Sequence, residues 1–189
     1  EFEYVTPTAL MKREQGDTLF FARVAQAIAE VQDHYDVVVI DCPPQLGYLT
    51  LSAMTAATAV LITIHPQMLD VMSMSQFLQM TGDLLESVAK AGASTDYDWM
   101  KYLITRFEPG DGPQNQMVAF LRQIFGEHVL NHPMLKSTAI SDAGLTNQTM
   151  FEIERSQLTK ATYDRALESV NNVNSEIEAL IKGAWGRAT

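Results

Sequence analysis

Hydrophobic and polar positions alternate between helical and strand-like periods along the chain. Residues 17–32 place apolar side chains three or four positions apart, which predicts a helix with Asp17 or Thr18 as its N-cap. Residues 37–40 form an unbroken β-branched run, which is typical of a central parallel strand covered on both faces. This change of period is the first sign of an α/β protein.

The same alternation continues to the end of the chain, apart from an irregular pattern over residues 138–157. The further predicted elements are helices at residues 46–57, 73–90, 113–124 and 162–182, and strands at residues 59–64, 100–107 and 129–130. Strands that alternate with helices predict an α/β fold with a doubly wound, mainly parallel sheet and flanking helices. In such a sheet, ligands lie beyond the carboxyl ends of the strands.

Composition and charge narrow the possible functions. The 189 residues carry a formal net charge of −10, and no run of basic residues exceeds the pair Lys12-Arg13. A generic nucleic-acid coat protein needs a surplus of Lys and Arg, so this class is disfavoured. Any DNA contact would have to use a local basic patch. The single cysteine, Cys42, excludes an internal disulfide framework and fits a reducing compartment.

The most informative chemistry follows the first predicted strand. Asp41 ends the run of residues 37–40, so its carboxylate is expected at the carboxyl edge of the sheet, where Mg²⁺ would find the oxygen ligands it prefers. Pro43 and Pro44 then deny two backbone donors and end the strand, and Gly47 allows a tight turn. A strand that ends in aspartate also fits a simple helix cap, so both interpretations stay open at this point.

Four segments together resemble one known family. Residues 37–57 (VVVIDCPPQLGYLTLSAMTAA) are similar to the Walker B region of ParA-type ATPases, the deviant-Walker group that includes MinD. Residues 62–77 (ITIHPQMLDVMSMSQF), 102–109 (YLITRFEP) and 132–145 (HPMLKSTAISDAGL) resemble the larger plasmid-partition ParA proteins called RepA in repABC replicons. The resemblance covers roughly residues 20–181, with the segments in the family order.

The resemblance implies a plasmid-partition ATPase with ATP and Mg²⁺ as cofactors. Proteins of this family form a homodimer when ATP is bound, bind DNA nonspecifically, and hydrolyse ATP when a ParB-type or RepB-type centromere-binding partner stimulates them. Members of the RepA type also repress their own operon. The implied location is the bacterial cytoplasm, in association with the nucleoid and not with a membrane.

The resemblance also implies roles for particular residues, although none is assigned as catalytic. Asp41 would hold Mg²⁺, with water between. The residues expected near the nucleotide are Asp41, Pro43, Pro44, Thr105 and Arg106. The residues expected to contact DNA are Lys136, Arg106 and Arg122. For Thr105 an ordinary strand end, and for Lys136 a solvated side chain, are the structural alternatives.

The chain departs from the family in one respect. The family's Walker A loop is Gly-rich and carries two lysines, but no Gly-Lys dipeptide occurs anywhere in the 189 residues. We therefore expect residues 1–189 to be the C-terminal part of a ParA-like ATPase domain that does not turn over ATP by itself. Two alternatives remain, a MinD-like membrane-associated ATPase and a noncatalytic binding or dimerisation module. The C-terminal residues 176–189 (EIEALIKGAWGRAT) offer only Lys182 and Arg187 for anionic lipid, which disfavours the MinD-like alternative.

Three other side chains invite a chemical role. His128 and His132 are four residues apart, a spacing that binds metal on a helix, but their segment is predicted to be strand and loop. Structural roles are therefore expected for both histidines. Cys42 adjoins Asp41, where a reactive thiol of low pKa and a small buried residue are the alternatives.

Overall fold

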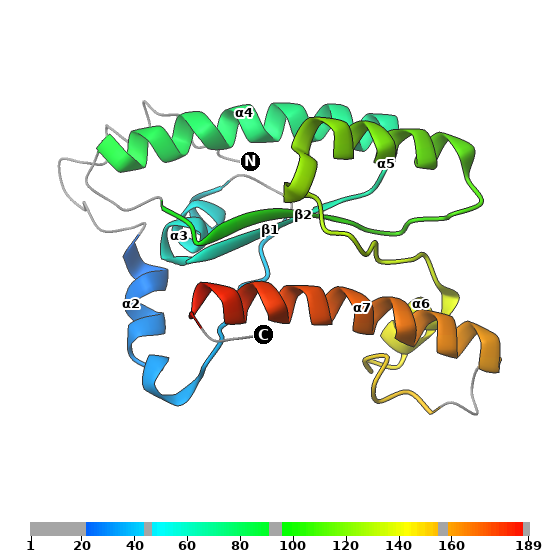
Figure 1. Cartoon of the computed structure of the whole chain (residues 1–189). Coiled ribbons are helices and arrows are strands. Elements are labelled where there is room, and N and C mark those ends of the chain that lie inside the picture. Colours follow the sequence, from blue (N-terminus) through cyan, green and yellow to red (C-terminus); the bar gives the residue numbers. More distant parts are fainter. Residues whose placement is uncertain (1–21, 44–46, 91–95, 155–158, 187–189) are drawn as a thin grey trace. The chain divides into compact units, whose positions relative to one another are not determined.

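The computed structural model describes residues 22–43, 47–90, 96–154 and 159–186 (Figure 1). Its elements in chain order are α2 (Arg23–Ala29), η2 (Gln32–His34), α3 (Tyr48–Ala56), β1 (Ala59–Ile64), α4 (Met68–Lys90), β2 (Trp99–Ile104), α5 (Gly112–Phe125), η3 (Gly126–His128), α6 (Thr138–Leu145) and α7 (Lys160–Ala184). Strands and helices alternate, so the predicted α/β fold class is confirmed.

The chain divides into two compact units. One comprises Glu1–Val60 and Met74–Asp98, and the other comprises Leu61–Ser73 and Trp99–Thr189. We call them unit 1 and unit 2 and describe each by itself.

The sheet is parallel and centres on β2. Strand β1 pairs with β2, and the segment after η3 adds a third line of hydrogen bonds on the other edge of β2. The Leu130 N–H donates to the Tyr102 carbonyl over 2.9 Å, and isolated parallel bridges join Tyr102 to Val129 and Phe107 to Leu135. The short strand predicted at residues 129–130 is thus present as bridges and not as a full strand.

Helices cover both faces of β2 within unit 2. Successive side chains of a strand point to opposite faces, and Tyr102 and Leu103 follow this rule. The centroid of the Tyr102 ring lies 4.4 Å from that of the Phe125 ring of α5. Leu103 packs with Leu130 and with Val173 of α7, which is 1% exposed. A strand buried on both faces explains the nearly continuous apolar sequence of β2.

Unit 1 is built around α2 and α3. Helix α3 buries Leu51, which is 1% exposed, and its Ser52 hydroxyl accepts a hydrogen bond from the Val24 N–H of α2. The Tyr97 hydroxyl donates to the Met54 carbonyl over 3.1 Å, which ties the chain before β2 to α3. Desolvation raises the pKa of Tyr97, so this hydroxyl remains a donor at neutral pH.

Helices α2, α4 and α6 differ from the prediction. Helix α2 ends at Ala29, three residues before the predicted end, and its predicted start with Asp17 or Thr18 as N-cap lies outside the described residues. Helix α4 begins at Met68, five residues before the predicted start. Helix α6 lies within residues 138–157, where the apolar pattern is irregular and predicts no helix. It is only eight residues long and buries only the small residues Ala139 and Ala143, so its apolar period is weak. Ser137 caps it by accepting a hydrogen bond from the Ala139 N–H.

The prediction of a buried strand at residues 37–40 requires correction. These residues lie in neither a helix nor a strand, and Val39 is 88% exposed. A central parallel strand needs hydrogen-bonded neighbours on both edges and helices on both faces. Within the described ranges, the two-stranded sheet consists of β1 and β2 alone, and the β-branched run gains no such cover. The run has the composition of a buried strand, but no described residues pack around it to bury it.

The polar contact at Ser169 offers a test of how α7 is held. This hydroxyl is buried, accepts from the Leu135 N–H over 2.8 Å and donates to the Pro133 carbonyl over 3.2 Å. We expect Ser169→Ala to lower the free energy of unfolding by about 1–3 kcal/mol, because a buried N–H loses its acceptor. Urea denaturation would measure it, with Ser175→Ala at an exposed position of the same helix as the control. Equal stability of the two variants would contradict this account.

Candidate functional site

Asp41 lies in unit 1, on the exposed segment that follows residues 37–40. Its carboxylate is open to solvent. Because residues 37–40 form no strand, the expectation that Asp41 ends a strand at the carboxyl edge of the sheet is corrected. Pro43 is exposed as well, and Pro44 lies outside the described residues. Of the expected nucleotide residues, Asp41 and Pro43 therefore belong to unit 1, whereas Thr105 and Arg106 belong to unit 2.

Cys42 does not have the properties of a reactive thiol. Desolvation raises its pKa, and the charge of the adjacent Asp41 carboxylate raises it further. Since the thiolate is the nucleophile, a raised pKa lowers reactivity at neutral pH. The side chain is nevertheless exposed, so the expectation of a small buried residue is corrected too.

In unit 2, three of the predicted site residues lie at one edge of the sheet: Thr105 and Arg106 follow β2, and Lys136 follows the segment that bridges to it. The half-buried Thr105 donates its N–H to the Ile64 carbonyl at the end of β1 over 2.8 Å. Arg106 follows with a φ of 52°, the left-handed region that side chains rarely adopt. Such a backbone costs about 1–3 kcal/mol and tends to occur at functional sites. The Lys136 N–H donates to the Phe107 carbonyl over 3.0 Å, which brings Lys136 to the same edge.

The Lys136 side chain forms an ion pair that sequence spacing did not indicate. Its Nζ lies 2.9 Å from Oε1 of Glu108, which begins the turn before α5. The Glu108 N–H in turn donates to Oε1 of the buried Gln114 over 3.0 Å. Asp111 caps α5 by accepting from the Gln114 N–H, and Pro113 occupies its first turn. The turn is therefore held by the start of its own helix.

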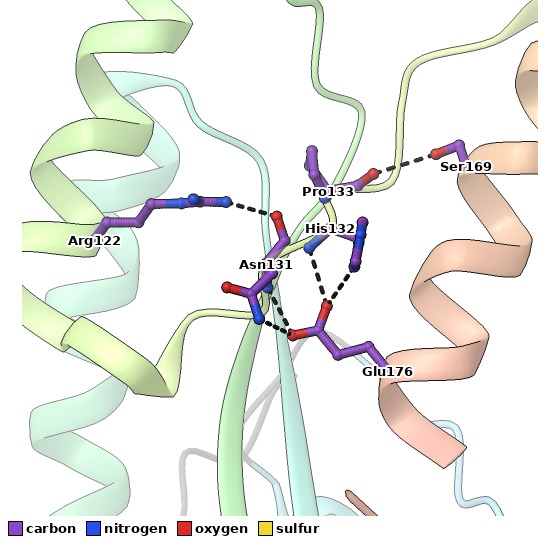
Figure 2. Close-up of polar contacts among 6 residues, drawn as sticks. All are labelled: Arg122, Asn131, His132, Pro133, Ser169 and Glu176. Atoms are coloured by element: carbon purple, nitrogen blue, oxygen red, sulfur yellow. Dashed lines mark hydrogen bonds and ion pairs between the residues drawn. The ribbon is translucent and has the colours of Figure 1, made fainter. Parts of the chain in front are cut away.

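A second polar cluster holds the chain just before Lys136 (Figure 2). The Glu176 carboxylate of α7 accepts from the Asn131 N–H over 2.7 Å and from the His132 N–H over 3.0 Å. The Asn131 side-chain amide and the His132 ring contact the same carboxylate at 3.0 and 2.9 Å. From the other side, the Arg122 guanidinium of α5 donates to the Asn131 carbonyl over 2.8 Å. We call these four residues the α7 clamp.

The α7 clamp changes the interpretation of three predicted residues. Arg122, expected to contact DNA, has an exposed side chain that donates a hydrogen bond to the Asn131 carbonyl. His132 contacts Glu176, and the His128 ring lies 3.2 Å from the Met100 carbonyl, so both histidines make structural contacts. No group of three potential metal-ligating side chains occurs within the described ranges. Glu176 itself was missed, because it lies 44 residues beyond its partner His132 and belongs to no motif.

Burial and hydrogen bonding oppose each other at Glu176. Burial raises the pKa of this carboxyl, but the N–H groups of Asn131 and His132, followed by the His132 ring, lower it. The net pKa lies below that of an ordinary glutamate. Its side chain is 17% exposed, so the charge is screened less than on an open surface.

The α7 clamp predicts a pH dependence of stability. The folded pKa of Glu176 is lowered, so its contribution is complete above the unfolded pKa and is lost as pH falls through the folded value. We expect Glu176→Gln to destabilise the protein by about 1.5–3 kcal/mol at pH 7. The gap to wild type should narrow below about pH 4.3, the ordinary glutamate pKa.

Denaturation midpoints between pH 7 and pH 3 would measure this gap, with the exposed Glu168→Gln of α7 as the matched control. A pH-independent gap for Glu176→Gln would refute the electrostatic part of the account.

The described part of the chain contains no helix that is long and apolar enough to cross a bilayer.

Comparison with known proteins points in one direction. Residues 6–91 match the family described as an AAA domain. The whole chain is 69% identical to a protein of Rhizobium rhizogenes named "Putative replication protein A", of which it covers 47%. It is 57% identical to a protein of the same name from Sinorhizobium fredii strain NBRC 101917 / NGR234, over 99% of this chain and 46% of the relative. The chain thus spans about half the length of the curated relatives it matches.

More distant relatives and solved structures agree. Protein SopA of Escherichia coli K12 is 31% identical over 84% of this chain and 41% of its own length. The apo McdA structure from Cyanthece has a TM-score of 0.62 at 16% identity and covers 84% of this chain and 59% of its own. A structure named Partition Protein has a TM-score of 0.55 at 18% identity, covering 86% of this chain and 42% of its own. The two structures share the fold, and the sequence relatives confirm what the motifs indicated: the chain is a homologue of the ParA-type partition proteins.

Proposed function

We propose that this chain forms the Walker B side of an ATP-dependent plasmid-partition protein. In the proposed cycle, ATP and Mg²⁺ stabilise a homodimer, the dimer binds DNA nonspecifically in the cytoplasm, and a ParB-type partner stimulates hydrolysis. The observation that carries the proposal is the similarity over the full chain to a putative replication protein A and over 84% of the chain to SopA, with Asp41 directly after the β-branched run. Autorepression of an operon would belong to the same protein.

The residues present suit the proposed cofactor. An exposed carboxylate offers the hard oxygen that Mg²⁺ prefers, and Asp41 provides one. Magnesium, when bound, would neutralise charge on the phosphates. In unit 2, Thr105 and the strained Arg106 stand at a sheet edge of the kind where α/β proteins bind ligands. One structural neighbour, cobyrinic acid a,c-diamide synthase of Mycobacterium smegmatis, was solved with bound ADP and magnesium, at 23% identity.

The proposed DNA contact rests on local charge. Lys136 is exposed at the carboxyl edge of the sheet, where its N–H donates to the Phe107 carbonyl. An ammonium there can neutralise one phosphate and release its counterions. Arg122 is a weaker candidate than the sequence indicated, because it also holds Asn131.

Substitution of Asp41 tests the metal role. In a protein of the relatives' full length, we expect Asp41→Asn to lower Mg²⁺-dependent ATP hydrolysis about 10- to 100-fold, as for residues that hold a metal through an intervening group. Asp36→Asn, an exposed acid on the same segment, is the matched control. Steady-state phosphate release would measure both variants, and equal rates would exclude Asp41 from the metal site. The same phosphate-release assay on the 189-residue chain alone should show negligible ATP turnover, because this chain has no Gly-Lys loop to hold the phosphates.

Substitution of Lys136 tests the DNA role. We expect Lys136→Ala to weaken binding to duplex DNA of any sequence and to reduce the slope of log affinity against log salt by about 0.9. Fluorescence anisotropy between low and high salt would give both quantities for the ATP-bound protein. Lys160→Ala, at the exposed start of α7, is the control. An unchanged slope for Lys136→Ala would remove this residue from the interface.

A further inference from the structure

Lys136 already has an anion within reach before any DNA arrives. Its Nζ lies 2.9 Å from Oε1 of Glu108. Both side chains are about half exposed, at 54% for Lys136 and 45% for Glu108, so a phosphate in solution can approach the same ammonium. The pair therefore lies where the proposed DNA contact would form.

The backbones of both partners are fixed. The Lys136 N–H donates to the Phe107 carbonyl over 3.0 Å, in the register set by the parallel bridge between Phe107 and Leu135. The Glu108 N–H donates to the buried Gln114 side chain, and the Glu108 carbonyl accepts from the Asp111 N–H over 2.9 Å. Because both main chains are held, only the two side chains have to be ordered for the pair to form.

We infer that Glu108 is an affinity-determining residue, an internal carboxylate that competes with DNA phosphate for Lys136. Carboxylate and phosphate are both oxyanions, and the lysine ammonium is a compact point charge whose donors serve whichever anion is nearer. A phosphate contact made by Lys136 either displaces Glu108 or shares the ammonium with it, and in both cases a carboxylate charge stands beside the DNA. The inference rests on the proposed function and concerns the regulation of that same site.

The competition fits the charge of the whole chain. With a net charge of −10, the protein has few cations to spare for DNA, and one of them is held by an acid at the proposed interface. Glu108 would therefore keep nonspecific binding weak and readily reversed by salt. A purely structural role, a tie between two strand ends, is the competing account, and it predicts no effect on DNA.

The chain offers a closely matched control for this idea. Glu178 and Lys182 form an i,i+4 ion pair on α7 with an N–O distance of 2.7 Å and side chains that are 63% and 45% exposed. Glu178→Gln removes one negative charge and releases one lysine, as Glu108→Gln does, but away from the sheet edge. The two variants have the same net charge, so a difference between them reports position and not total charge.

The experiment measures binding of random-sequence duplex DNA to the full-length protein with ATP and Mg²⁺, by fluorescence anisotropy at several salt concentrations. We expect Glu108→Gln to bind about 2- to 5-fold more tightly than wild type, the range that corresponds to an exposed ion pair. The gain should shrink as salt rises, because exposed charges are screened. Glu178→Gln should show a smaller gain. In a Lys136→Ala background, Glu108→Gln should add no more than Glu178→Gln adds, as a double-mutant cycle requires of a pairwise effect.

Three outcomes would overturn the inference while leaving the proposed function intact. Glu108→Gln could match Glu178→Gln, it could weaken binding, or its gain could persist without Lys136. Each would show that Glu108 does not compete for that ammonium. Absence of DNA binding by wild type and every variant, with thermal melting showing that all are folded, would instead overturn the proposed DNA function and this inference with it.

Discussion

Unit 2 depends on β2 being paired on both edges and covered on both faces. One edge bonds to β1 and the other to the segment after η3, while Tyr102 meets α5 and Leu103 meets α7. A parallel strand exposes its polar backbone unless both edges are satisfied, so the third segment cannot shift register without breaking bonds to Tyr102 and Phe107. The place of Lys136 at the sheet edge follows from this register.

The α7 clamp secures the same segment from outside the sheet. The Glu176 carboxylate accepts from the backbone N–H groups of both Asn131 and His132. The Ser169 hydroxyl, earlier on the same helix, accepts from the Leu135 N–H. Helix α7 therefore covers an apolar face and also supplies hydrogen-bond acceptors to the segment after η3, which pairs with β2 only at isolated bridges. The N–H groups of an irregular segment need acceptors outside a continuous ladder, and here side chains of α7 supply them.

Charge is used sparingly at the proposed site. The proposed DNA contact of an acidic chain needs cations that are grouped locally. Here pairing places the backbone of Lys136 beside Phe107, the residue after Arg106. Glu108 forms an ion pair with Lys136, and Glu176 fixes the backbone of the chain before Lys136. Weak, reversible DNA contact is what such an arrangement favours.

The sequence by itself determined the α/β class, β1, β2, most of the helices and the ParA-type homology, because each of these depends on local period or on contiguous motifs. Only the tertiary structure decided that residues 37–40 stand exposed, that Arg122 holds Asn131, and that Lys136 faces Glu108. The physical reason is the same in each case. Apolar periodicity records what a segment is suited to bury, whereas pairing partners are set by residues that the fold brings together, such as Glu176 and His132, which are 44 positions apart.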